Sequence, residues 1–167
     1  MDSRKAPALA GSAVFLAIAP GFVAVVVPWW ISHWRVNSAI LAWPMVRWAG
    51  MVLASIGAMG LLDSFARFAL QGIGTPAPVF PTRHLVISGL YRYVRNPMYV
   101  SVVLTILGQG LVFGNLTLIE YGALVWLLFH AFVRVYEEPV LTATFGDEYR
   151  SFCRQVPRWI PRFRRLQ

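Results

Sequence analysis

The chain has 167 residues, of which 57% are hydrophobic and 13% are charged. Soluble domains carry about 25% charged residues, so this composition excludes an ordinary soluble domain and indicates one integral membrane domain over residues 1–167. The formal net charge is +8, but no aromatic and basic module of a nucleic-acid-binding fold accompanies it. We therefore expect membrane lipids, and no nucleic acid, to be the partners of the basic surface.

Four segments are apolar over about the length that a membrane-spanning helix needs. The first follows Arg4 and Lys5 as a signal peptide would, but it is long and lacks a clear small-residue cleavage site, so we predict a retained helix. The second contains small residues that suit close helix packing. The predicted spans cover residues 12–31, 46–70, 98–113 and 116–136, of which the first two form a variable part, residues 1–70.

Only Gly114 and Asn115 separate the third and fourth segments. So short a connection predicts a tight antiparallel hairpin. Tyr99 at the start of one helix and Glu137 at the end of the other should then meet at the same membrane face. The sequence therefore predicts that two polar motifs about forty residues apart form one site.

Positive charge predicts the orientation of these spans. With four spans, both termini, the arginine-containing loop before the third span and the arginine-rich tail lie on one side, which the positive-inside rule makes cytoplasmic. We predict a multi-pass protein whose termini and active site are cytoplasmic. After Glu138, Pro139 can open a helix at its first turn, and residues 140–156 mix apolar and charged residues as an interfacial helix does.

Groups able to do chemistry are concentrated between residues 83 and 99 and at Glu137 and Glu138. Arginine recognises planar anions, carboxylates bind cations, and Asn96 lies before a proline at a predicted helix N-terminus, where backbone donors point outward. Together these groups suit a small zwitterion. Singly, the arginines could set topology, the tyrosines could form an interfacial belt, and Glu138 could pair with Arg134.

Other candidate sites are weak. The histidines lack ligand spacing and the chain has one cysteine, Cys153, so we expect no metal site and no intramolecular disulfide. No glycine loop of the nucleotide-binding kind is present. Asp63 and Arg67, four residues apart, are expected to form a structural pair.

The chain resembles the isoprenylcysteine carboxyl methyltransferase family, which is related to membrane phospholipid N-methyltransferases. The similarity covers about residues 71–163, and the first two spans carry no comparable signature. It rests on several motifs in the family's order: Leu85-Val86-Ile87-Ser88-Gly89-Leu90-Tyr91, Arg95-Asn96-Pro97-Met98-Tyr99, Glu137-Glu138-Pro139-Val140-Leu141, Phe145-Gly146-Asp147-Glu148-Tyr149 and Val156-Pro157-Arg158-Trp159-Ile160-Pro161.

The resemblance implies S-adenosylmethionine-dependent methyl transfer, with the cofactor between the cytoplasmic ends of the last helices and a lipophilic acceptor entering from the bilayer. Carboxylates suit the amino group of the methionine moiety, and arginine or asparagine suits its carboxylate. The implied catalytic candidates are Glu138, Tyr99 and Arg95. The implied cofactor-binding residues are Gly89, Tyr91, Arg95, Asn96, Pro97, Tyr99, Glu137 and Glu138.

One residue departs from the family pattern, because the family usually has histidine where this chain has Asn96. Asparagine forms hydrogen bonds but does not titrate near neutral pH, so it cannot shuttle a proton.

The acceptor and two alternative functions stay open. An ionised carboxylate acceptor needs no general base, whereas an amine or thiol must lose a proton, for which Glu138 or Tyr99 is the local candidate. A membrane reductase that binds NADPH is one alternative, since sterol reductases share a similar C-terminal region. The other is a noncatalytic scaffold whose basic tail binds anionic lipid.

Overall fold

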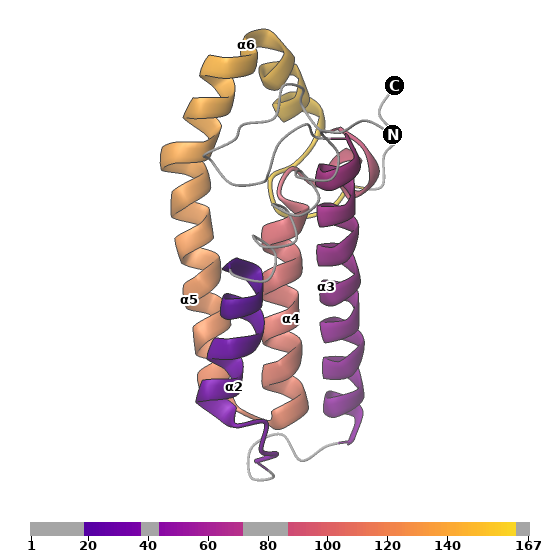
Figure 1. Cartoon of the computed structure of the whole chain (residues 1–167), viewed down its shortest axis with the longest axis vertical. Helices are drawn as coiled ribbons and strands as arrows, with labels where there is room; N and C mark the ends of the chain where they lie inside the picture. Colours follow the sequence, from indigo (N-terminus) through magenta and orange to yellow (C-terminus); the bar gives the residue numbers. More distant parts are fainter. Residues whose placement is uncertain (1–18, 38–43, 72–86, 163–167) are drawn as a thin grey trace, which may run out of the picture.

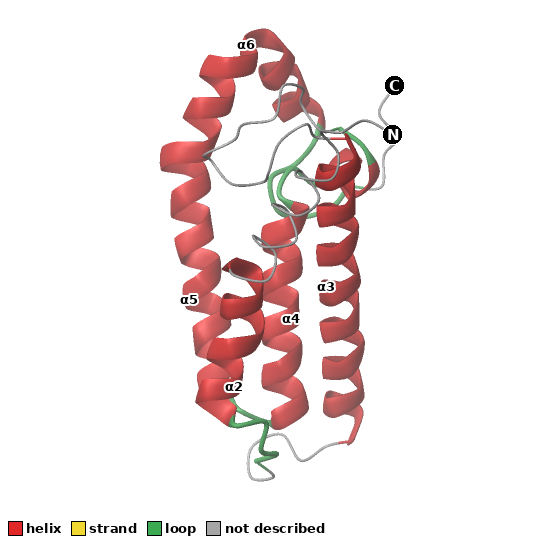
Figure 2. Cartoon of the chain, viewed as in Figure 1, coloured by secondary structure: helices red, strands yellow, loops and turns green. Residues whose placement is uncertain are grey.

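The computed structural model describes residues 19–37, 44–71 and 87–162 (Figure 1). Regular structure within these ranges is entirely helical (Figure 2). The segments η1 and η3 are π-helical, and η2 is a 3-10 helix. In chain order the elements are η1 (Phe22–Val26), α2 (Val27–Ser32), α3 (Pro44–Gln71), η2 (Gly89–Arg92), α4 (Pro97–Phe113), α5 (Leu116–Phe132), η3 (Val133–Glu137) and α6 (Glu138–Gln155).

Two helical stretches are long and apolar enough to cross a membrane, Pro44–Arg67 and Leu116–Gln155. Only 11% and 22% of their most apolar windows are buried, so most of this apolar surface lies on the outside, where a helix in lipid carries it. The apolar helices Ala19–Ser32 and Pro97–Phe113 are shorter. Residues 12–18 of the predicted first span lie outside the described residues.

Each π-helical turn lies close before a proline, Pro28 or Pro139. Proline has no N–H to donate to the carbonyl four residues back, so regular α-helical bonding cannot continue there. In η1 the carbonyl that lacks a backbone donor, because Pro28 has no N–H, is that of Ala24. The side-chain amide of Gln109 donates to this carbonyl at 2.7 Å. The chain therefore stays helical across both prolines.

This continuity corrects one sequence expectation. We predicted a fourth span that ends near residue 136 and a separate interfacial helix from residue 140, but the helix continues from Leu116 through Phe145, and a further helical stretch follows Gly146 up to Gln155. The actual change of direction comes later, at Gly146, whose φ of 54° is left-handed and favours glycine. Beyond it, a small cluster of Tyr149, Phe152 and Val156 packs against Leu141 and Phe145.

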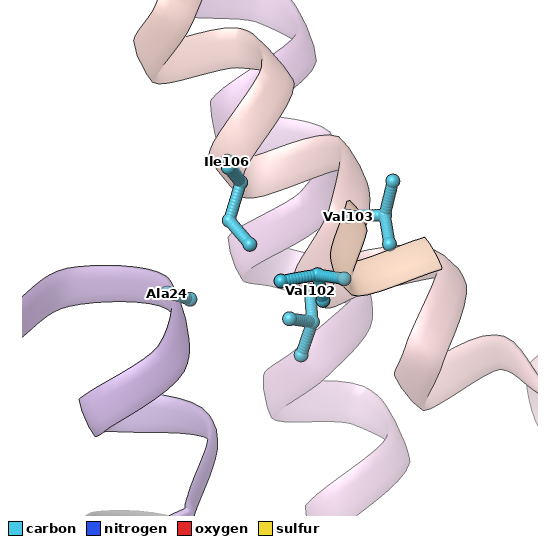
Figure 3. Packing of buried hydrophobic residues seen from close by; sticks show 5 residues of the cluster. Ala24, Val102, Val103 and Ile106 are labelled. Carbon is cyan, nitrogen blue, oxygen red and sulfur yellow. The ribbon is translucent and has the colours of Figure 1, made fainter. Parts of the chain in front are cut away.

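Small residues bring α3 and α4 together. A Cβ atom at Gly108 would lie 2.4 Å from the backbone nitrogen of Ala54, so the two backbones nearly touch. Helices in lipid gain much of their association energy from such close van der Waals packing. Figure 3 shows part of a second contact of α4, a buried cluster that joins it to η1 and α5 and comprises Ala24, Val102, Val103, Ile106 and Val125.

A short turn connects α4 to α5. Gly114 has a left-handed φ of 63°, and the side chain of Asn115 accepts a 3.2 Å hydrogen bond from the backbone N–H of Leu118 at the start of α5. The two helices contact each other and lie side by side (Figure 1). The start of α4 and the end of α5 consequently lie toward the same end of the bundle.

Candidate functional site

The C-terminal segment after α6 runs beside the connection between η2 and α4. The backbone N–H of Arg95 donates to the carbonyl of Pro157 at 2.9 Å, and the backbone N–H of Arg162 donates to the carbonyl of Tyr93 at 3.0 Å. The side-chain amide of Asn96 donates to the carbonyl of Arg158 at 3.2 Å. Asn96 therefore holds this segment in place, and its side chain forms no cap on α4.

Two arginines hold Glu138. Arg95 Nη1 donates to Oε1 of Glu138 at 2.9 Å, while Arg158 donates to Oε1 from Nε at 2.7 Å and to Oε2 from Nη2 at 2.8 Å. The hydrogen bond to Glu138 raises the pKa of Arg158, so the charged guanidinium is favoured. Both carboxylate oxygens are engaged, an arrangement that suits positioning the arginines better than accepting a proton.

Arg95 has a buried donor without a partner within the described part of the chain. Its side chain is 12% exposed, and Nη1 also contacts Sγ of Cys153 at 2.8 Å. Its Nε is buried and has no partner among the described residues. An unsatisfied buried donor costs about 1–3 kcal/mol, so an anionic ligand that accepted this hydrogen bond would be bound favourably.

Tyr99 on α4 and Glu137 at the end of η3 form the second polar contact. The Tyr99 hydroxyl donates to Oε2 of Glu137 at 2.9 Å, and the Tyr99 ring packs against Phe129 with 4.6 Å between ring centroids. The other carboxylate oxygen, Oε1, lies outside this hydrogen bond. Tyr91 is buried near the same carboxylate, and burial raises the pKa of Tyr91, so its hydroxyl stays protonated.

Gly89 and Pro97 lie on a different side of this region. Both line a cavity of about 850 Å3 that also contacts α3. Gly89 has a φ of 59°, and a Cβ atom there would lie 1.8 Å from Nε of Arg67, so only glycine fits. Arg67 in turn donates to Oδ2 of Asp63 at 2.8 Å, which is the pairing that the sequence predicted.

The eight predicted site residues are thus divided between two neighbouring places. Six take part in or border the polar contacts around the two glutamates, and Gly89 and Pro97 face the cavity. Sequence reasoning gave no role to Arg158, although it lies in one of the motifs that carried the family resemblance. It also missed Trp159, whose Nε1 donates to Nδ1 of His130 on α5 at 3.0 Å and so anchors the C-terminal segment.

No group of three or more His, Cys, Asp and Glu side chains within the described ranges is arranged to hold a metal ion.

Comparisons with known proteins support the family resemblance. The sequence model of a family described as phospholipid methyltransferase matches residues 45–148. A Schizosaccharomyces pombe protein named protein-S-isoprenylcysteine O-methyltransferase is 35% identical over 78 residues, which are 46% of this chain and 33% of that protein. An uncharacterized Haemophilus influenzae protein is 38% identical over 64 residues, which are 38% of this chain and 100% of that protein. The chain therefore matches only about one third of the length of the S. pombe protein.

Proposed function

This chain belongs to the phospholipid methyltransferase family, and from that premise we propose that it is a membrane enzyme that transfers a methyl group from S-adenosylmethionine to a lipophilic acceptor. One observation carries the proposal. Within the matched region, Arg95, Tyr99, Glu137 and Glu138 come together at one end of an apolar helical bundle. The name of the S. pombe relative, an O-methyltransferase, supports the same reaction class.

The side chains around the two glutamates suit the methionine moiety of the cofactor. Oε1 of Glu137 would accept from the ammonium group, and the buried Nε of Arg95 would donate to the carboxylate. Glu138 would then keep Arg95 and Arg158 in position, and Tyr99 would orient Glu137. The cofactor supplies an electrophilic methyl group on a sulfonium, so the protein mainly has to align the reactants and exclude water.

The local hydrogen bonds favour a methyl acceptor that is already deprotonated when it binds. The Tyr99 hydroxyl donates a hydrogen bond to Glu137, and both oxygens of Glu138 accept hydrogen bonds from arginines. Neither group is therefore well placed as a general base. An ionised carboxylate acceptor agrees best with this arrangement, ahead of an amine or a thiol.

We further propose four membrane spans, with the polar site and both termini on the cytoplasmic side. The end of α2 and the start of α3 lie at the end of the bundle opposite the site (Figure 1). Trp30, Trp34 and Trp48, in or next to these segments, are exposed. Tryptophan is typical of the membrane–water interface. The exposed Arg92, Arg134 and Arg154 lie toward the end of the bundle that carries the site. Under the positive-inside rule they support a cytoplasmic orientation of that end.

Titration calorimetry of the purified chain in detergent tests the donor site. We expect S-adenosylhomocysteine to bind, and Glu137→Gln to weaken that binding about tenfold because a charge-assisted hydrogen bond is lost. Glu120→Gln is the control, because Glu120 is exposed near the opposite end of α5, about 25 Å along the helix. Absence of binding heat would refute the proposal, and binding of NADPH instead would support the reductase alternative, which the family match does not favour. Donor binding also argues against a noncatalytic scaffold.

A further inference from the structure

The cavity of about 850 Å3 lies between α3, residues 88–104 and Pro161. Its size is within the range of small-molecule sites. Gly60 lets α3 and α4 approach each other closely beside this cavity, since a Cβ atom at Gly60 would lie 2.5 Å from Oγ of the buried Ser101. Its lining includes Gly89 and Pro97 but none of Arg95, Tyr99, Glu137 and Glu138, so this groove lies beside the proposed donor site and shares none of its charged side chains.

The groove changes from apolar to charged along the helix axes. Ile56 and Met59 of α3 face Leu104 of α4 at its apolar end, whereas Arg67 and Arg92 line its other end. Ile56 and Arg67 are separated by about 16 Å along α3, from a rise of 1.5 Å per residue. The apolar end lies within the stretch of α3 that is long and apolar enough to cross a membrane, and the charged end lies in the last turns of α3, which ends at Gln71.

The charged end carries a surplus of positive charge. Two arginines and one aspartate line it, which leaves one net positive charge. Arg67 uses its Nε to bind Asp63, so its two Nη groups lie outside that ion pair. Arg92 is exposed and forms no ion pair with any described residue. Guanidinium groups in this position recognise a phosphate at the membrane surface.

We propose that this groove binds one anionic phospholipid of the surrounding bilayer. The phosphate lies at Arg92 and the Nη groups of Arg67. The part of one acyl chain nearest the headgroup lies along Ile56, Met59 and Leu104. The proposal does not depend on methyl transfer. It predicts that lipid binding survives loss of the donor site, because the two sites share no charged side chain.

Native mass spectrometry of the full chain, delipidated in detergent, tests the proposal with phosphatidylglycerol and phosphatidylcholine of identical acyl chains. We expect the first phosphatidylglycerol to bind about fivefold or more tightly than phosphatidylcholine, and Arg92→Gln to remove most of that preference, because one charge-assisted contact is lost. Arg134→Gln is the matched control, since Arg134 is exposed but does not line the groove.

A second pair of variants tests the apolar end. Met59 and Leu62 are 61% and 60% exposed on the same helix, but only Met59 lines the groove. Met59→Trp should weaken both lipids several-fold by filling the groove, and Leu62→Trp should not. Equal binding of the two lipids, equal effects of Arg92→Gln and Arg134→Gln, or equal effects of the two tryptophan variants would overturn the proposal. Displacement of phosphatidylglycerol by an equal concentration of oleate would overturn the assignment to a phospholipid.

Discussion

The Tyr99 hydroxyl donates a 2.9 Å hydrogen bond to Glu137, 38 positions further along the chain. Tyr99 lies near the start of α4 and Glu137 is the last residue of η3, so the contact depends on α5 running back beside α4. The same return brings Arg95 to Glu138. These two contacts join the motif before α4 to the paired glutamates, and they are the basis of the proposed donor site.

Tyr99→Phe should weaken binding of S-adenosylhomocysteine about 3- to 10-fold, because Glu137 loses a hydrogen bond worth about 1 kcal/mol. The ring and its packing against Phe129 remain, so the melting temperature should change little. Titration calorimetry and thermal unfolding measure the two effects. Tyr121→Phe is the control, since it removes a hydroxyl that donates to the Val23 carbonyl at 3.0 Å instead. Equal losses of affinity in the two variants would contradict the assigned site.

Arg158→Gln should destabilise the folded chain by about 2 kcal/mol, because it leaves Glu138 with one of its two cationic partners in a partly buried site. In a double-mutant cycle with Glu138→Gln we expect a coupling energy of about 1–2 kcal/mol, measured by denaturant unfolding in micelles.

Arg150→Gln provides the comparison for that cycle. Its pair with Asp147 is 62% and 95% exposed, so its loss should cost less than about 0.5 kcal/mol. Additive effects of Arg158→Gln and Glu138→Gln would show that the bidentate contact contributes nothing to stability.

Asn96→His should make stability depend on pH near neutrality. Asn96 is buried beside Arg158, so a histidine there would be charged less readily in the folded state than in the unfolded state, whose pKa is about 6.5. The folded pKa is then the lower one, so stability is complete above about pH 6.5 and falls as the pH drops below it. Melting temperatures from pH 5 to 8 check this, with wild type as the control. A variant that became more stable on acidification would show that the imidazolium is stabilised at this position.

Gly108→Ala should destabilise the chain by about 2 kcal/mol or more, because the new Cβ would meet the backbone of Ala54 at 2.4 Å and push α3 away from α4. Gly122→Ala should cost clearly less, because its nearest atom is the end of the Leu107 side chain at 2.8 Å, which can rotate. Thermal unfolding in the same detergent compares the two. The packing account fails if Gly122→Ala is the more damaging substitution.

The sequence by itself determined that the fold consists of apolar helices, and it determined the approximate extent of α3, α4 and α5. Apolar runs of the right length, a proline at the start of α4 and a two-residue connection after Phe113 are local signals, because each depends on neighbouring residues. The same connection predicted that Tyr99 and Glu137 approach each other. It did so because a chain that reverses within two residues must run back along itself.

Only the tertiary structure decided the long-range partners of Glu138 and Asn96. Arg158 became the bidentate partner of Glu138, and Asn96 bonded to the Arg158 carbonyl instead of capping α4. The helix also continued through Pro139 and turned only at Gly146. The spacing of residues could not predict these contacts, because the partners are 20 to 62 positions apart in the sequence. Whether two such side chains meet depends on how the folded backbone orients them.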